Sequence, residues 1–126
     1  MPAMASRPEF TSSVKVQHLP DQSGDGVHAF AYTITIVNSG SVTAQLVARH
    51  WVITDAQGHT EQVRGLAVVG HQPVLKPGEQ FEYTSWTRIA TPQGTMRGTF
   101  FCMTEDAHPF DAPVPEFMLA VPSALH

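Results

Sequence analysis

The stretch HAFAYTITIV at residues 28–37 decides the fold class of this 126-residue chain. Large side chains alternate with small ones along the whole stretch, and β-branched residues are frequent. This period of two predicts a β-strand with one face in a hydrophobic core and the other turned outward. The side chains expected on the core face are His28, Phe30, Tyr32, Ile34 and Ile36.

Other short segments with strand-like patterns lie on both sides of this one. They are Val14–Leu19, Val47–Thr54, His59–Arg64, Gln80–Trp86, Thr95–Thr104 and Pro109–Leu119. Turn sequences separate them, including Asp55–Gly58 and the pair Pro77-Gly78, which suits the centre of a type II turn. With 10 Pro and 9 Gly in the chain, a helical bundle is disfavoured. The sequence predicts an all-β protein, an antiparallel two-sheet sandwich of the immunoglobulin-like kind.

The chain length fits one domain. We expect residues 1–10 to form a flexible N-terminal segment, residues 11–121 the sandwich, and residues 122–126 a flexible tail. The last strand carries three prolines, at 109, 113 and 115, and is therefore expected at a sheet edge.

Composition narrows the classes of function. The net charge of −4 argues against nucleic acid or an anionic membrane as a partner. A single cysteine, Cys102, excludes an internal disulfide, and no secretion signal or membrane-spanning stretch is visible, so a cytoplasmic location is expected.

The predicted strands 47–54 and 95–104 have patterns that indicate which side chains enter the core. Val47, Trp51 and Ile53 are expected on one face of the strand 47–54, and Arg49 interrupts that face. In the strand 95–104 both faces are apolar, since Met96, Phe100 and Cys102 oppose Phe101 and Met103.

Several of these segments together resemble the ApaG family. The matching residues are Phe30–Ile36, Arg49-His50-Trp51, Val63–Gly70, Gln72–Gly78, Phe81–Ser85 and Thr91–Gly98. The match runs in order over nearly the whole chain. The resemblance implies a fibronectin type III-like sandwich, a loose connection to cobalt and magnesium homeostasis in bacteria, and protein–protein contact where the domain is attached to larger eukaryotic proteins. It implies no particular chemistry.

The family's glycine-rich segment appears here as Gly65-Leu-Ala-Val-Val-Gly70, with Ala67 where the family usually has its middle glycine. A dinucleotide site needs close backbone approach at that glycine and a helix directly after the loop. Pro73 and Pro77 leave no room for such a helix. A glycine-bounded loop or bulge that joins the two sheets is the expected structure.

Metal binding has weak candidates only. The seven histidines are scattered without ligand spacing, and His59 could approach Asp55 and Glu61 across the hairpin. We expect no cofactor.

No catalytic arrangement stands out either. Cys102 lies in an apolar run that predicts a buried, inert thiol, and no serine sits in a nucleophile elbow. The sequence therefore favours a protein that is not an enzyme.

The remaining candidates are surface residues that could bind an unidentified protein. The residues from Thr87 to Gly98 are expected to form a long loop, with Trp86, Arg88 and Met96 as anchors. Further candidates are Arg49, His50, Arg64, Gly65 and Gly70. The main hypothesis is a protein-interaction module, and the alternative is a small-ligand or divalent-metal binding protein. A homodimer through exposed edge strands is also expected to be feasible.

Overall fold

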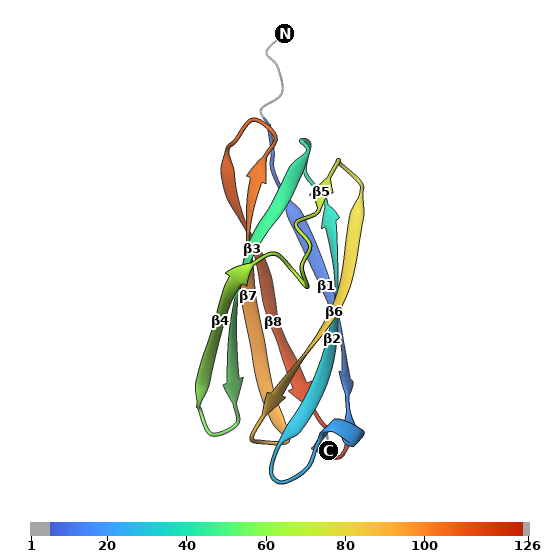
Figure 1. The fold of residues 1–126 in the computed structure, drawn as a ribbon, viewed down its shortest axis with the longest axis vertical. Helices are drawn as coiled ribbons and strands as arrows, with labels where there is room; N and C mark the ends of the chain where they lie inside the picture. The colour runs from blue at the N-terminus through green and yellow to red at the C-terminus, as the bar shows by residue number, and fades with distance from the viewer. Residues whose placement is uncertain (1–5, 125–126) are drawn as a thin grey trace.

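The structure is a computed structural model and describes residues 6–124. These residues form eight strands and two single-turn 3-10 helices (Figure 1). In chain order they are β1 Phe10–His18, η1 Pro20–Gln22, β2 His28–Asn38, β3 Ala44–Asp55, β4 Thr60–Leu66, β5 Val74–Leu75, β6 Gln80–Ile89, β7 Gln93–Thr104, β8 Pro109–Ala120 and η2 Pro122–Ala124.

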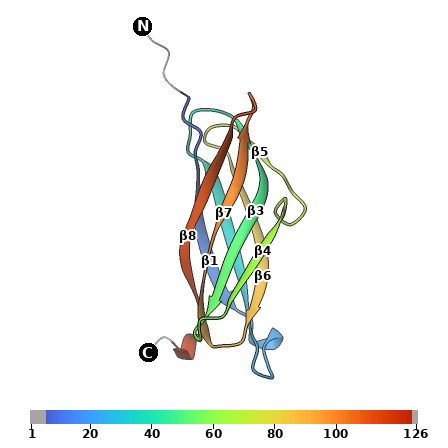
Figure 2. The same ribbon diagram turned by 90° about the vertical axis from the view of Figure 1, so that its left-hand side faces the viewer.

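The strands form two antiparallel sheets. The three-stranded sheet has the order β1-β2-β6, and the five-stranded sheet has the order β4-β3-β7-β8 with β5 also paired to β3. Figure 2 looks onto the five-stranded sheet, and the three-stranded sheet lies behind it. The predicted all-β, two-sheet antiparallel sandwich is confirmed, and the proline-rich β8 is a terminal strand as expected.

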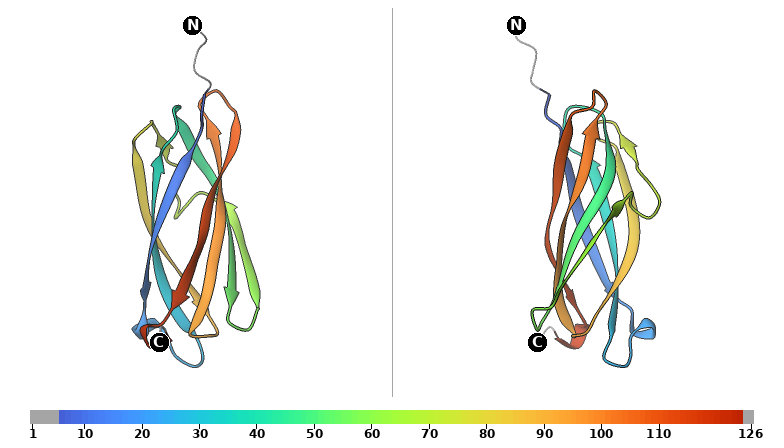
Figure 3. Two further views of the ribbon diagram at one scale, coloured as in Figure 1. Left: turned by 180° about the vertical axis from the view of Figure 1, so that it is seen from behind. Right: turned by 60° about the vertical axis from the view of Figure 1, so that its left-hand side comes forward.

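The two long sides of the sandwich differ. On one side β1 lies next to β8 (Figure 3). On the other side β6 and β4 are the terminal strands. The segment 67–73, which connects β4 to β5 and which we call the crossing segment, passes through the space between these two terminal strands (Figure 1). Val68, in the middle of this segment, is fully buried in the core.

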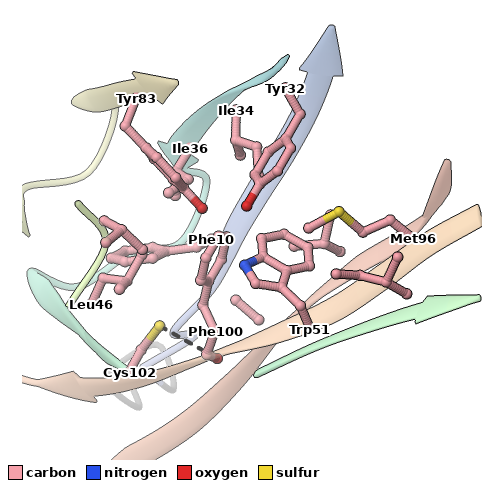
Figure 4. Close-up of a cluster of buried hydrophobic side chains, with 14 of the residues drawn as sticks. Phe10, Tyr32, Ile34, Ile36, Leu46, Trp51, Tyr83, Met96, Phe100 and Cys102 are labelled. Atoms are coloured by element: carbon pink, nitrogen blue, oxygen red, sulfur yellow. Dashed lines mark hydrogen bonds between the residues drawn. The ribbon is translucent and has the colours of Figure 1, made fainter. Parts of the chain in front are cut away.

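The core lies between the sheets, and the alternation along β2 places its residues as predicted. Phe30, Ile34 and Ile36 are fully buried, and Tyr32 is nearly so. Trp51, from the opposite sheet, packs edge-on against Tyr32 and Phe100 (Figure 4). The sandwich is thus held by aromatic and branched side chains from both sheets.

The chain enters the first strand earlier than the sequence pattern indicates. β1 begins at Phe10 rather than Val14, and Phe10 is buried against the Phe110 ring, with ring centres 5.5 Å apart. Residue 10 therefore belongs to the sandwich and not to the N-terminal segment. Flexible ends stay a prediction, because residues 1–5 and 125–126 lie outside the described part of the chain.

The prediction of a long loop from Thr87 to Gly98 is wrong. β6 continues to Ile89 and β7 begins at Gln93, so only residues 90–92 connect them. Gly94 lies inside β7, where a Cβ atom would come within 2.6 Å of the Thr54 carbonyl oxygen. The glycine that looked like a loop residue is required by close strand packing.

A β-bulge corrects the expected face of β3. The pairing of β3 with β7 shifts between Leu46 and Ala48, so Val47 is the extra residue. Leu46 takes the buried position expected for Val47, and Arg49, Trp51 and Ile53 share the inward face beyond the bulge. The extra residue moves the inward positions from even-numbered to odd-numbered residues. A prediction based on a strict period of two cannot include this change.

The chain changes sheets at the predicted Pro77-Gly78 turn. Gly78 has a φ of 86°, and the Glu79 N–H donates to the Lys76 carbonyl at 2.9 Å, as a type II turn requires. The segment from Gly65 to Gly70 does not make this change, since β5 after it still pairs with β3. No helix within residues 6–124 has the length and apolar character to cross a membrane.

Candidate functional site

The candidate residues from the sequence fall in separate places rather than in one cleft. Trp86 and Arg88 lie together on the outer face of the three-stranded sheet. Arg49 and Gly65 lie at the crossing segment, and Asp55 and His59 lie at the β3–β4 turn. His50 and Arg64 are paired across β3 and β4 on the outer face of the five-stranded sheet, and both reach Gln62.

The pair Trp86 and Arg88 forms the most exposed aromatic site of the described chain. Trp86 is 60% exposed, and the Arg88 guanidinium carbon lies 5.0 Å from the centre of its ring. Both side chains lie on one face of β6 because they are two residues apart. This face is the outer one, since both are exposed whereas Tyr83 and Ile89 of the other face are buried. With Leu19 and Gln22 they line a hollow of about 310 Å³, which we call the Trp86–Arg88 surface.

Leu19 and Gln22 were not recognised from the sequence. They precede and end the short helix η1, which follows β1, whereas Trp86 and Arg88 belong to β6. β2 pairs with both strands and brings the two segments to the same end of the sheet. No sequence signal connects residue 22 with residue 88, so only the folded sheet could reveal the hollow.

Charge around Arg88 is mostly negative. Asp21 and Asp25 share a second hollow with Arg88, and Asp55 and Glu61 share a third. A cation beside acidic groups favours a partner with both charges rather than a purely anionic ligand such as a nucleic acid.

Arg49 has a structural role. Its Nη1 donates to the carbonyl oxygens of Leu66 and Ala67 at 3.0 and 2.9 Å and so holds the start of the crossing segment. A Cβ atom on Gly65 would come within 2.7 Å of the same Nη1, which explains the glycine. Ala67 and Val69 have positive φ angles of 69° and 48°, so the segment is strained as well as clamped. Gly70, the last candidate of this segment, has a φ of 80° and is exposed.

The hairpin histidine contacts a carboxylate at the turn. His59 Nδ1 lies 3.2 Å from an oxygen of Asp55, whose other oxygen accepts backbone N–H bonds from Gln57 and His59. Partial burial acts to raise the pKa of Asp55, but these hydrogen bonds outweigh it and hold the pKa below its usual value. Glu61 borders the same hollow. Within residues 6–124, no three His, Cys, Asp or Glu side chains are placed to share a metal ion.

Met96 and Cys102 lie in the core. Met96 is fully buried, so its assignment as a surface anchor is wrong; its place in the even-numbered, inward set of β7 explains this. Burial, with a smaller effect from the Asp111 carboxylate, raises the pKa of the Cys102 thiol to about 12. At neutral pH this thiol is protonated and enclosed.

The five-stranded sheet also has an exposed apolar region that the sequence pattern does not predict as a whole. Leu66, Val74, Phe101 and Met103 are exposed on its outer face. The sequence indicates two of these four residues, because Phe101 and Met103 alternate with buried residues of β7. The contributions of β4 and β5 depend on their pairing with β3.

Comparison with known proteins places these sites in a family context. The ApaG domain family matches residues 18–104. A relative from Ralstonia nicotianae, named Protein ApaG, is 61% identical over 123 residues, which is 96% of this chain and 99% of the relative. Protein ApaG of Nitrosospira multiformis is 52% identical and covers 98% and 100% of the two chains. The crystal structure of an ApaA protein from Bordetella pertussis superposes with a TM-score of 0.88 at 50% identity, covering 91% of this chain and 95% of that one.

Proposed function

This chain belongs to the ApaG domain family, and we propose that it is a non-enzymatic module that binds a protein partner through the Trp86–Arg88 surface. The observation that carries the proposal is the 60% exposure of Trp86 beside Arg88 and a hollow. Tryptophan and arginine are the residues most enriched among the side chains that dominate binding energy at protein interfaces.

The position of β6 supports the same proposal. Within the described chain β6 is a terminal strand of its sheet, so the edge away from β2 has no strand partner. An extended segment of another protein can add to such an edge through main-chain hydrogen bonds, while outward side chains select it. Trp86 and Arg88 stand beside this edge and suit a partner segment that carries an apolar side chain and both charges.

A non-enzymatic role agrees with the surroundings of the two side chains considered for catalysis or metal binding, Cys102 and His59. Cys102 is enclosed with a raised pKa, and His59 is occupied with Asp55 at an exposed turn. The alternative, a cation-binding protein, has no comparable support, because Arg88 borders the hollow that contains Asp55, His59 and Glu61. A cation site would have to form next to this positive charge. A cytoplasmic location is part of the proposal.

Affinity capture followed by titration tests the proposal. A protein captured by the wild-type chain is identified, purified and titrated against Trp86→Ala, Arg88→Ala and Lys15→Ala. Lys15 is an exposed residue on the outer face of the same sheet, on β1, and serves as the matched control. We expect Trp86→Ala to weaken binding by about 30-fold or more and Lys15→Ala to leave it unchanged. Equal binding by Trp86→Ala and the wild-type chain would contradict the proposed surface.

A further inference from the structure

The outer face of the five-stranded sheet carries a contiguous apolar region. Leu66, Val74, Phe101 and Met103 are 74%, 58%, 41% and 37% exposed. The strand register places Leu66, Ala48 and Phe101 in one row across the sheet, and Val74, Gln45 and Met103 in another. We call these four exposed side chains the apolar outer face. Its residues come from β7 and from β4 and β5, which pair with the other side of β3, so the face extends across β3.

Two opposite charges lie beyond the two ends of this face. Arg97 precedes Phe101 by four residues, and Glu105 follows it by four. At about 3.3 Å per residue, Arg97 lies about 13 Å from Phe101 along the strand direction. Both side chains are exposed. Arg97 belongs to the outward, odd-numbered set of β7, and Glu105 is the first residue of the turn between β7 and β8. The apolar outer face therefore lies toward the acidic end of the sheet, next to Glu105, and the basic side chains Arg64 and Arg97 lie toward the other end.

We propose that the apolar outer face binds a second copy of this chain, sheet against sheet. A two-fold axis would lie between the five-stranded sheets of the two copies. It would run parallel to the planes of these sheets, perpendicular to their strands and level with Phe101. Rotation about this axis reverses the strand direction, so Phe101 meets its equivalent in the second copy. Arg97 then faces Glu105 of the second copy, and the same contact forms twice, as an isologous interface requires.

A hollow at the acidic end fits the arginine that the symmetry brings to it. It measures about 300 Å³ and is bordered by Val74, Met103 and Glu105 among other residues. The aliphatic stem of Arg97 from the second copy can lie on the apolar lining, while its guanidinium reaches the Glu105 carboxylate. A self-complementary arrangement of charge and shape selects another copy of the chain over a partner of a single charge sign.

This self-association is independent of the proposed partner binding. The Trp86–Arg88 surface lies on the outer face of the three-stranded sheet, on the other side of the core. A dimer formed through the five-stranded sheets would leave both Trp86–Arg88 surfaces free, so one assembly could present two of them. It also differs from a dimer through strand edges, because no edge strand is extended by the contact.

Sedimentation equilibrium tests the proposal from about 1 µM to about 500 µM protein. The wild-type chain is expected to reach a monomer–dimer equilibrium in this range. Phe101→Glu should weaken the dimer at least tenfold, since a charge at the axis meets its own copy. Gln17→Glu adds the same charge on the exposed outer face of β1 and should leave the equilibrium unchanged. Unchanged circular dichroism of both variants will show that each one folds.

A mixing experiment tests the contact between Arg97 and Glu105 itself. Arg97→Glu and Glu105→Arg should each weaken the dimer, because each places like charges at both contacts. Mixed in equal amounts, they should restore dimers, since every contact then joins a glutamate to an arginine. A wild-type chain that remains monomeric at the highest concentration overturns the proposal. So does a dimer that survives Phe101→Glu, or a mixture that stays as weakly associated as its components.

Discussion

The two outer faces of this sandwich are built by the same alternation but have opposite characters. Near the middle of the three-stranded sheet the outward positions are polar and bonded across strands: the Thr33 and Thr84 hydroxyls lie 2.8 Å apart, and the Thr35 hydroxyl donates to Glu82 at 2.9 Å. On the five-stranded sheet, outward positions at one end carry Leu66, Phe101 and Met103. Among the described residues of the three-stranded sheet only the exposed ring of Trp86 has a large apolar area to gain from burial, whereas on the apolar outer face several neighbouring side chains gain free energy from it.

The comparison also separates the roles of the two tryptophans. Trp51 is buried between the sheets, and its indole nitrogen points toward the same part of the core as the Tyr32 and Tyr83 hydroxyls (Figure 4). Trp86 lies outside on the polar face, where Arg88 covers one part of its ring. The same residue type therefore stabilises the fold in one place and is available for recognition in the other.

The largest effect is expected from neighbouring phenylalanines of β7. Phe100 is fully buried and Phe101 is 41% exposed. Phe100→Ala should lower the free energy of unfolding of the monomer by about 3–5 kcal/mol, because it removes core contacts and leaves a cavity. Phe101→Ser should change it by about 1 kcal/mol or less while it weakens self-association. Urea denaturation at a dilution where only monomer is present measures both, and similar losses would remove the distinction between the two faces.

The next effect is a loss of stability at alkaline pH, to which both inner faces contribute. Burial raises the pKa of Cys102 to about 12 and also raises the pKa of Tyr83. The unfolded thiol ionises near its ordinary pKa, while the folded thiol stays protonated. The stabilisation is therefore complete below about pH 8.5 and falls by about 1.4 kcal/mol per pH unit between that pH and about pH 12, where the folded thiol ionises as well.

Two variants assign this alkaline loss to the two sheets. Cys102→Ala should flatten the fall that begins near pH 8.5, whereas Tyr83→Phe should flatten only the part above about pH 10. The Tyr83 hydroxyl is buried without a hydrogen-bond partner among the described residues, so Tyr83→Phe should cost little stability at neutral pH. Thermal denaturation over a pH series provides the measurement, and an unchanged pH profile of Cys102→Ala would contradict the burial argument.

A smaller effect is expected from the polar outer face. Thr84→Val removes the hydroxyl that bonds Thr33 but keeps the β-branched shape, so it should cost about 0.5–1 kcal/mol. It should leave self-association unchanged, in contrast to any polar substitution on the apolar outer face. Urea denaturation and sedimentation of the same sample separate the two readouts. A change in the dimer constant would show that the two faces are not independent.

The smallest effect concerns Asp111, which pairs with Phe101 across β7 and β8 and is exposed. Because it lies level with the proposed two-fold axis, the Asp111 carboxylates of the two copies would lie near each other. Asp111→Asn should therefore tighten the dimer by about threefold, the size typical of a single exposed charge contact. Sedimentation at low salt is the appropriate measurement, and weaker association would indicate a different axis.

The candidate site was less predictable than the fold, for reasons that particular residues make clear. Trp86 and Arg88 were recognised because exposed-type aromatic and basic residues in one short stretch suggest recognition. The sequence pattern predicts that Trp86 ends a strand and that Arg88 lies in a long loop after it. Gly94 is instead a strand residue that allows two backbones to approach. Met96 then moved from the surface to the core with the strand that contains it.

The sequence by itself determined the fold class, the core of β2, the turn at Pro77-Gly78 and the terminal position of β8. These depend on local rules: alternation, the fixed φ of proline, the positive φ of glycine and the missing N–H donor of proline. The tertiary structure alone decided the bulge at Val47, the clamp of Arg49 on the crossing segment, and the two outer faces. Each of these depends on which strands pair and in which register. The free energy that selects this pairing comes from contacts between residues far apart in the chain.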